Sequence, residues 1–412
     1  MNAGINADAN DIRPLARFAP APILLLVAFF LMLQPLSTDL YLASLPSLAT
    51  VFHAPMSTVQ LTLSMFVIAF GAAQLNIGPL SDRYGRRPVV IWGLCLYVVA
   101  SLLCAAAPTI ELLIAARFVQ ALGCCSAIII ARAIVRDAYA PEDSMRVIAR
   151  ASTWLALAPL FGPILGSWLQ VTFGWRAAFV ALSLFSGALL AAVVLRLPET
   201  NEHKNPGATA WAGLAANWRL VLSSRQFWAN ALPGALSYGS IFAFISGSSP
   251  VLIGILGVPT AWFGYCFAFS VAGYMSGTIA CRRLLSTFGP AITLRIGSTI
   301  SLGAGALFLA GVGFGLAHWM LVVAAMSLTM FAHGVNFPIA QTGAVTPFPQ
   351  QAGTAAGLMG ALYMGVAFAV GTAVGATYNG ALLPLAAIAA ILGLGVFLSV
   401  RLPALCSPEV KE

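Results

Sequence analysis

The segment GPLSDRYGRRP, residues 78–88, joins two long apolar stretches and is the most informative part of the sequence. Gly78 permits close helix contact at the end of the preceding apolar stretch, and Gly85 permits a turn with positive φ. Asp82 requires a cation or a helix N-terminus as its partner. The segment also carries three arginines: Arg83, Arg86 and Arg87. Arginines of this kind hold a turn on one side of a membrane. The segment therefore predicts a polar turn between two membrane-spanning helices.

The composition of the whole chain agrees with a membrane protein. Of its 412 residues only 8% are charged and 60% are hydrophobic, whereas soluble domains carry about 25% charged residues. A spanning helix needs roughly 20 apolar residues, and twelve such runs follow one another along the chain. They cover residues 21–45, 58–79, 89–107, 110–135, 147–171, 176–197, 227–252, 260–282, 290–311, 317–341, 353–377 and 381–401. We therefore predict an all-α membrane protein with twelve transmembrane helices.

The basic residues predict how the chain is oriented. Counting alternate loops, 18 of the 20 Lys and Arg residues fall on one side, and only Arg117 and Arg176 do not. The 18 are Arg13, Arg17, Arg83, Arg86, Arg87, Arg132, Arg136, Arg146, Arg150, Arg196, Lys204, Arg219, Arg225, Arg282, Arg283, Arg295, Arg401 and Lys411. Short cytoplasmic loops carry such an excess, so we expect both termini in the cytoplasm and the chain in a bacterial inner membrane. The charges form no contiguous stripe, and we expect no nucleic-acid partner.

The longest polar break in the chain predicts its division into two parts. It runs from Pro198 to Gln226. We predict a cytoplasmic N-terminal tail (1–20), a six-helix bundle (21–197), a cytoplasmic linker (198–226), a second six-helix bundle (227–401) and a cytoplasmic C-terminal tail (402–412). The basic turn after the second helix has a counterpart at Arg282 and Arg283 after the eighth. Parallel repeats of six helices are known in secondary transporters.

Other classes of protein lack support in the sequence. The only lysines, Lys204 and Lys411, do not end a phosphate-binding loop, and the four histidines are scattered. The seven cysteines fall mostly within apolar runs, which implies no disulfide framework. No ring of like polar groups indicates a channel. We expect no enzyme activity, no cofactor and no metal, and we expect a monomer whose partners are a small-molecule substrate, protons and the lipid bilayer.

The segment 78–88 resembles motif A of the major facilitator superfamily at nearly every position. This resemblance implies two six-helix pseudo-repeats around a central cavity, the major facilitator fold. It also implies that residues 78–88 form a cytoplasmic latch, in which Asp82 meets a partner across the interface between the halves and stabilises an outward-facing state. Residues 117–123 similarly resemble motif B of the superfamily.

The predicted fifth helix resembles motif C of the superfamily, over Ala158–Gly166. That motif marks drug/proton antiporters rather than uptake symporters. Its characteristic residues are Pro159, Gly162, Pro163 and Gly166. Together with Ser37–Pro46, the three motifs make the first half similar to the bicyclomycin-resistance (Bcr/CflA) branch of drug exporters.

Two charged residues inside predicted spans are candidates for the functional site. A charge in a membrane helix costs from a few to more than ten kcal/mol unless it faces a cavity or a partner. Asp39 and Arg117 each lie on the order of 10 Å below the outer end of their helix, at a rise of 1.5 Å per residue. Burial raises the pKa of a carboxyl group and a neighbouring arginine lowers it. Asp39 is therefore a proton-coupling acid or a cationic-substrate site, and the alternative is half of a permanent structural ion pair.

Several polar and aromatic residues complete the predicted site. Gln120 and Tyr41 lie close in sequence to Arg117 and Asp39, and His333 lies in the tenth span beside Asn336. His333 fits a substrate contact, a proton relay or a polar packing role. Aromatic residues are candidates for a cavity wall, although lipid-facing rings give the same pattern: they are Tyr41, Phe66, Tyr238, Phe242, Tyr265 and Phe269. The sequence favours proton-coupled export of small hydrophobic drugs or metabolites, and the alternative is a proton-coupled symporter that imports a small metabolite.

Overall fold

The computed structural model describes residues 20–202 and 204–401, which are mostly helical. The first half contains α1 (Pro20–Asp39), the 3₁₀ turn η2 (Leu42–Ser44), α2 (Leu45–Val51), α3 (Met56–Tyr84), α4 (Arg86–Ala106), α5 (Ile110–Ala138), α6 (Pro141–Leu155), α7 (Leu157–Phe173) and α8 (Arg176–Arg196). Next come η3 (Pro206–Thr209) and α9 (Trp211–Leu222). The second half contains α10 (Arg225–Ser249), the π-helical turn η4 (Pro250–Ile255), α11 (Thr260–Gly313), α12 (Trp319–Val345), α13 (Ala352–Thr377) and α14 (Leu383–Arg401). The predicted tails lie largely outside the described residues.

The predicted number of spans is confirmed for the described part of the chain. It holds 11 segments long and apolar enough to cross a membrane. One of them, α11, is 54 residues long and contains Gly289, whose φ of 73° and ψ of 175° are not helical. Pro290 follows, a residue suited to the first position of a helix. Because α11 is two helices in sequence, the 11 segments give twelve spans.

Two predicted helices are interrupted, in both cases next to proline. The first span was predicted as one helix over 21–45, but α1 ends at Asp39 and α2 begins at Leu45. The fifth was predicted over 147–171, but a break at Ala156 separates α6 from α7. Proline has no N–H for the carbonyl four residues earlier. Pro46 and Pro159 therefore withhold the helical bonds to the carbonyls of Leu42 and Leu155.

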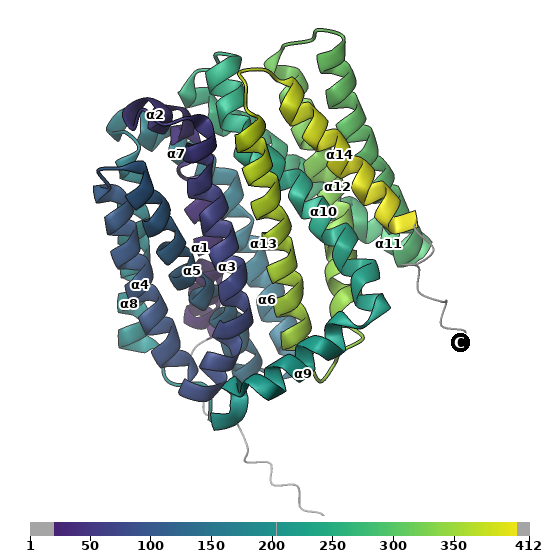
Figure 1. The fold of residues 1–412 in the computed structure, drawn as a ribbon. Coiled ribbons are helices and arrows are strands. Elements are labelled where there is room, and N and C mark those ends of the chain that lie inside the picture. The colour runs from purple at the N-terminus through teal and green to yellow at the C-terminus, as the bar shows by residue number, and fades with distance from the viewer. Residues whose placement is uncertain (1–19, 203, 402–412) are drawn as a thin grey trace, which may run out of the picture.

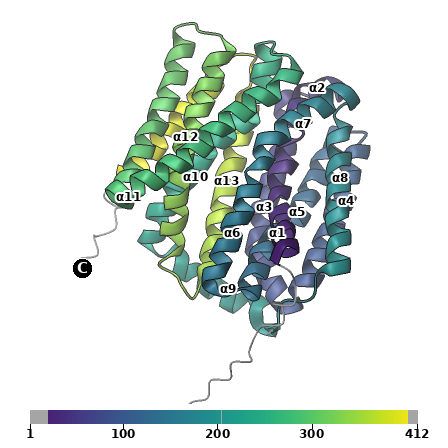
Figure 2. The same ribbon diagram turned by 180° about the vertical axis from the view of Figure 1, so that it is seen from behind.

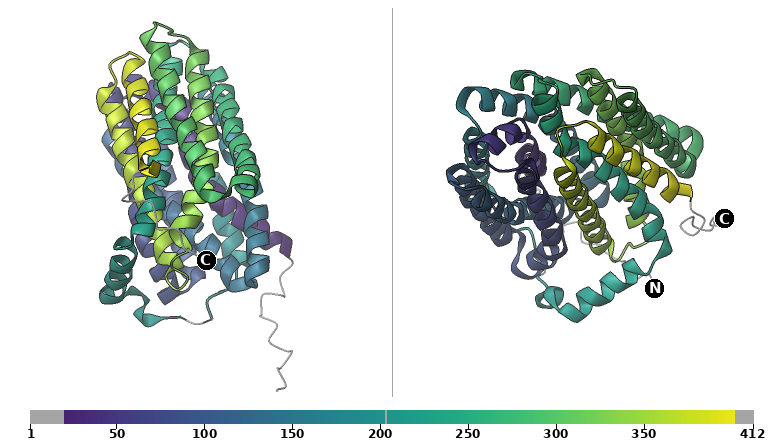
Figure 3. Two further views of the ribbon diagram at one scale, coloured as in Figure 1. Left: turned by 90° about the vertical axis from the view of Figure 1, so that its right-hand side faces the viewer. Right: turned by 45° about the horizontal axis from the view of Figure 1, so that its top comes forward.

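The helices form two bundles that lie side by side (Figures 1 and 2). At the boundary between the bundles, α3 of the first half packs against α13 of the second, and α7 packs against α11. The short helix α2 marks one end of the molecule and α9 crosses the other (Figure 3). We call these the α2 end and the α9 end. This arrangement confirms the predicted fold of two six-helix halves.

Glycines let the two halves approach closely. A Cβ atom added at Gly264 of α11 would lie 2.5 Å from Cα of Ile164 in α7, and one added at Gly375 of α13 would lie 3.3 Å from Cβ of Gln60 in α3. Small residues of this kind permit backbone contact between membrane helices. The glycines of α13 therefore allow this helix to pack closely against the first half.

Candidate substrate and proton site

Asp39 lies at the last turn of α1, where the two halves meet. Its side chain is buried, with the residue 4% exposed, and the hydroxyl of Thr38 lies 2.9 Å from its Oδ1 atom. A Cβ atom added at Gly162 of α7 would lie 3.3 Å from Cβ of Asp39. The absence of a side chain at Gly162 thus leaves room for the carboxyl group beside the segment that resembles motif C.

Arg117 of α5 is fully buried, with 0% of its surface exposed. Its guanidinium carbon lies 4.2 Å from the ring centroid of Phe66, 4.6 Å from that of Tyr41 and 5.8 Å from that of Phe179. Nη1 donates to Oε1 of Gln120 at 2.5 Å and Nε donates to the Thr62 carbonyl at 3.3 Å. Rings and neutral oxygens therefore surround this cation, and Nη2 has no hydrogen-bond partner among the described residues.

No ion pair joins Asp39 to Arg117 in the part of the chain that the structure describes. Asp39 and Arg117 were predicted at similar depths in the membrane, which would permit such a contact. In the structure the two side chains contact different residues. Tyr41, two residues after Asp39, presents its ring to the guanidinium, while Asp39 adjoins Gly162. The structure therefore gives no support to a permanent ion pair between them.

His333 is the centre of an aromatic cluster in the second half. Its Nδ1 atom lies 3.0 Å from the hydroxyl of Ser237. Its ring centroid lies 5.0 Å from that of Phe337, 5.9 Å from that of Tyr274 and 6.0 Å from that of Tyr238. These rings come from α10, α11 and α12, and they give the second half a face of π surfaces close to the boundary between the halves.

Tyr238 connects this cluster to the first half. Its ring stacks on Tyr363 with centroids 5.9 Å apart and an interplanar angle of 14°. Across the boundary, the Tyr238 phenol lies near the side chain of Gln34 and within electrostatic range of Asp39. The acid of α1 and the aromatic cluster around His333 are therefore candidates for one central site between the halves.

The basic turn after α3 is organised by three carboxylates. Asp82 Oδ1 lies 2.6 Å from Nη1 of Arg86, and Nε of Arg86 donates to Oδ2 of Asp137 at 2.9 Å. Glu199 accepts the backbone N–H groups of Arg86 at 2.8 Å and Arg87 at 3.2 Å. Since these N–H groups are the first of α4, Glu199 caps that helix with a negative charge. The described partner of Asp82 is thus in its own half, not across the interface.

The turn also holds the chain that follows α8. Nδ2 of Asn201 donates to the Asp82 carbonyl at 3.1 Å, the Asn205 N–H donates to the same carbonyl at 3.0 Å, and Arg83 Nη1 donates to Thr209 at 2.6 Å. Gly85 has a φ of 106°, as the sequence predicted, and a side chain there would collide with Glu199.

The family model described as Major Facilitator Superfamily matches residues 27–372 of the sequence. The chain belongs to this superfamily. It is a multi-pass membrane transporter, and the fold described above is that of the superfamily.

Two curated relatives carry resistance names. The chain is 32% identical over 339 residues to a chloramphenicol resistance protein of Pseudomonas aeruginosa, covering 82% of this chain and 80% of the relative. It is 29% identical over 355 residues to a bicyclomycin resistance protein homolog of Haemophilus influenzae, covering 84% of this chain and 85% of the relative.

Two solved transporters share the fold. The human organic anion transporter MFSD10 has a TM-score of 0.69 at 20% identity, covering 95% of this chain and 100% of the other. The xylose transporter XylE of E. coli, in a partially occluded inward open conformation, has a TM-score of 0.69 at 14% identity, covering 93% and 96%. At these identities they support the fold alone.

The structure separates the six aromatic candidates of this transporter. Tyr41 and Phe66 enclose Arg117, Phe242 is buried, and Tyr238 lies in the central site. Tyr265 and Phe269 are 55% and 66% exposed, and they share their face of α11 with the exposed Trp262. These two do not line the central site, because Gly264 turns the opposite face of the helix toward α7.

Several residues of the site were missed by the sequence analysis. Gln34 was visible only as a polar interruption of the first span, and Gln60 carried no signal beyond being polar. In the structure the hydroxyl of Ser246 in α10 donates to Oε1 of Gln60 in α3 at 3.1 Å, which joins the halves. Glu199 had one available signal, its place directly after a helix that ends beside the basic turn.

Proposed function

We propose that the chain exports small, largely apolar compounds from the cytoplasm in exchange for protons, by alternating access of its two halves to a central site. The observation that carries this proposal is Asp39, a buried carboxyl group with no cationic partner in the described structure, beside Gly162. The names of the two resistance relatives support a drug or antibiotic as the exported compound.

In this proposal Asp39 carries the proton. A carboxylate is costly to bury without a partner, so Asp39 releases its proton only when water reaches it from one side of the membrane. When the halves rock, water reaches it from the other side. Substrate and proton then use the same cavity in turn. Gln34 lies on the same helix as Asp39, and Tyr238 and the cluster around His333 form the wall across from them. Arg117 is enclosed by the rings of Tyr41 and Phe66, and its positive charge contributes to the electrostatic potential around α1.

We propose that the described conformation is inward-facing. At the α2 end the halves are joined by Gln60 with Ser246, and η2 packs against α10 and α11. At the α9 end Asp82 pairs with Arg86 inside the first half, which fits a released latch. This orientation places the α9 end and both termini in the cytoplasm, in a bacterial inner membrane, with the chain as a monomer of two bundles (21–197 and 227–401) joined by the linker 198–226.

The proposal is tested with purified protein in proteoliposomes. An imposed pH gradient should drive chloramphenicol transport, and Asp39→Asn should lower that rate at least tenfold because the side chain no longer releases a proton. Asp143→Asn is the matched control, since Asp143 is an exposed acid of α6 that pairs with Arg146.

Two results decide against the proposal. If Asp39→Asn retains transport driven by the pH gradient, Asp39 is not the coupling acid. If the substrate moves in the same direction as the protons, the chain is the importing symporter instead.

A further inference from the structure

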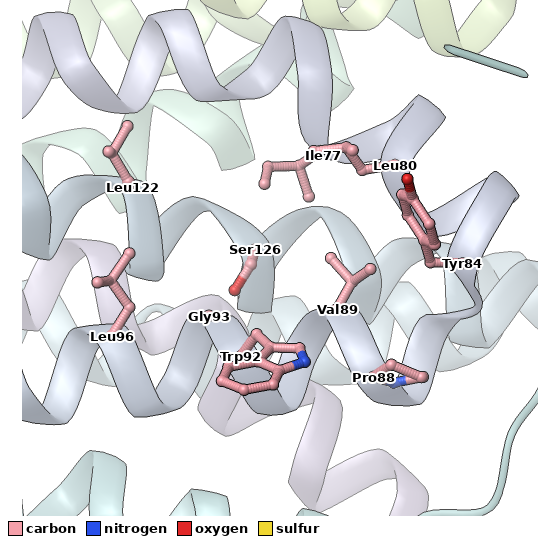
Figure 4. A pocket seen from close by; sticks show the side chains of 10 residues that line it. All are labelled: Ile77, Leu80, Tyr84, Pro88, Val89, Trp92, Gly93, Leu96, Leu122 and Ser126. Carbon is pink, nitrogen blue, oxygen red and sulfur yellow. The ribbon is translucent and has the colours of Figure 1, made fainter.

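An apolar groove lies on the side of the first half, away from the central site (Figure 4). It runs between α3, α4 and α5 and has a volume of about 530 Å³. Its walls are mainly aliphatic, with Ile77 and Leu80 on α3, Val89 and Leu96 on α4, and Leu122 on α5. We call it the lateral groove. Its size falls in the range of about 300–1,000 Å³ typical of small-molecule sites.

The lateral groove opens to the membrane and is closed toward the interior. Trp92 stands on its rim and is 76% exposed. At its floor α4 and α5 are in backbone contact, because a Cβ atom added at Gly123 would lie 2.5 Å from the Gly93 carbonyl oxygen. A side chain at Gly93 would collide with Ser126. The groove therefore communicates with lipid and is separated from Asp39.

One end of the lateral groove is basic. Tyr84 lines the groove where α3 ends, and the guanidinium carbon of Arg83 lies 5.2 Å from the centroid of the Tyr84 ring. Arg83 is exposed, and its guanidinium donates a hydrogen bond to the hydroxyl of Thr209. No carboxylate of the described residues lies within ion-pair distance of Arg83. A cation without a carboxylate partner among the described residues thus lies at the polar end of the lateral groove.

We propose that the lateral groove holds one acyl chain of an anionic phospholipid, with the phosphate of its headgroup on Arg83. Two observations carry this assignment. The groove is apolar along the membrane-facing length of α4, as an acyl chain requires, and Arg83, next to the lining residue Tyr84, has the sign that complements a phosphate. Basic residues at the cytoplasmic surface attract anionic headgroups. The assignment rests on the proposed orientation, with the α9 end at the cytoplasmic surface, and does not depend on the transported substrate.

Brominated lipids test the proposal, because bromine on an acyl chain quenches a tryptophan that it touches. The full-length protein is reconstituted with increasing mole fractions of brominated phosphatidylglycerol or brominated phosphatidylcholine. The signal of Trp92 is the difference between the wild-type protein and Trp92→Phe. We expect half-maximal quenching of Trp92 at a mole fraction of phosphatidylglycerol at least threefold lower than that of phosphatidylcholine. Arg83→Gln should abolish this preference, and Arg83→Lys should retain most of it.

The control is Trp262, an exposed tryptophan of α11 that does not line the lateral groove. Its signal, from Trp262→Phe, should respond equally to the two lipids. Equal quenching of Trp92 by both lipids would show ordinary boundary lipid and overturn the proposal. Absence of quenching by either lipid would overturn it as well. A preference that survives Arg83→Gln would refute the role of Arg83, provided that the variant elutes as a single species.

Discussion

Arg117 is a buried cation whose neighbours are aromatic rings and amide oxygens. Replacing it with methionine, which has a similar length and no charge, removes a guanidinium that has no carboxylate partner in the described structure. Burying an unpaired charge is costly, so removing it is favourable, whereas losing the charge-assisted bond to Gln120 costs about 1.5–3 kcal/mol and offsets that gain. We expect the free energy of unfolding of Arg117→Met to stay within about 1 kcal/mol of the wild type. Denaturant unfolding of the purified protein in one detergent measures this.

Arg176→Met is the control for this experiment, because Arg176 also stacks on an aromatic ring, that of Trp175, but lies at the start of α8. A loss of about 3–5 kcal/mol in Arg117→Met would contradict the expectation, since that is the cost of breaking a buried ion pair. It would restore the alternative in which Arg117 and Asp39 hold each other in place.

At the residue scale the sequence predicted which charged residues lie inside the helical bundles, but not which residues they contact. Asp39 and Arg117 stood out because charges are rare in apolar spans. Their contacts depend on the rotation of α1 and α5 about their own axes, which one sequence does not contain. The hydrogen bond between Ser246 and Gln60 joins residues 186 positions apart, and no local sequence pattern predicts it.

At the scale of helices, close contact between α7 and α11 depends on Gly264. A Cβ atom there would lie 2.5 Å from Cα of Ile164, while one added at Gly303, beyond the Gly289 break in α11, would meet nothing within 4 Å. Gly→Ala in a helix gains about 0.5–1 kcal/mol where space allows, and overpacking costs about 1–3 kcal/mol. We expect Gly264→Ala to lower the melting temperature in detergent and Gly303→Ala to raise it.

The two substitutions make the same chemical change on the two sides of the Gly289 break in α11, and only the methyl group added at Gly264 meets α7. If Gly264→Ala is as stable as Gly303→Ala, α7 and α11 do not pack as closely as described. The transport rate is a second measurement, because a side chain at Gly264 weakens the conformation in which these helices touch.

The positions of the helices were largely predictable from the sequence. The breaks within the first and fifth predicted spans were harder to predict. Long apolar runs predict spans because lipid leaves no other way to satisfy the backbone. The breaks before Pro46 and Pro159 follow from missing N–H groups, but other prolines, such as Pro163 and Pro233, lie inside helices. Helix α9 was missed because it lies within a stretch taken as a polar linker, and its apolar residues are too few for a span.

At the scale of the whole molecule, the contacts between the halves differ at the two ends. At the α2 end, side chains and turns of both halves meet, with Gln60 at the centre of the contact. At the α9 end, the basic turn binds the chain after α8 through Glu199, Asn201 and Asn205. The proposed alternating access requires the α2 end to open, so a covalent bond across it should stop transport.

Gln60 and Gly375 offer a place for that bond. A Cβ atom added at Gly375 would lie 3.3 Å from Cβ of Gln60, close to the Cβ separation of about 3.5–4.5 Å in disulfides. We expect Gln60→Cys/Gly375→Cys to form a disulfide on oxidation and to lose at least nine-tenths of its transport rate. A reductant should restore the rate, and each single variant should be insensitive to oxidation. Full transport by the cross-linked protein would mean that α3 and α13 stay together at the α2 end throughout the cycle, so that the opening must lie between α7 and α11.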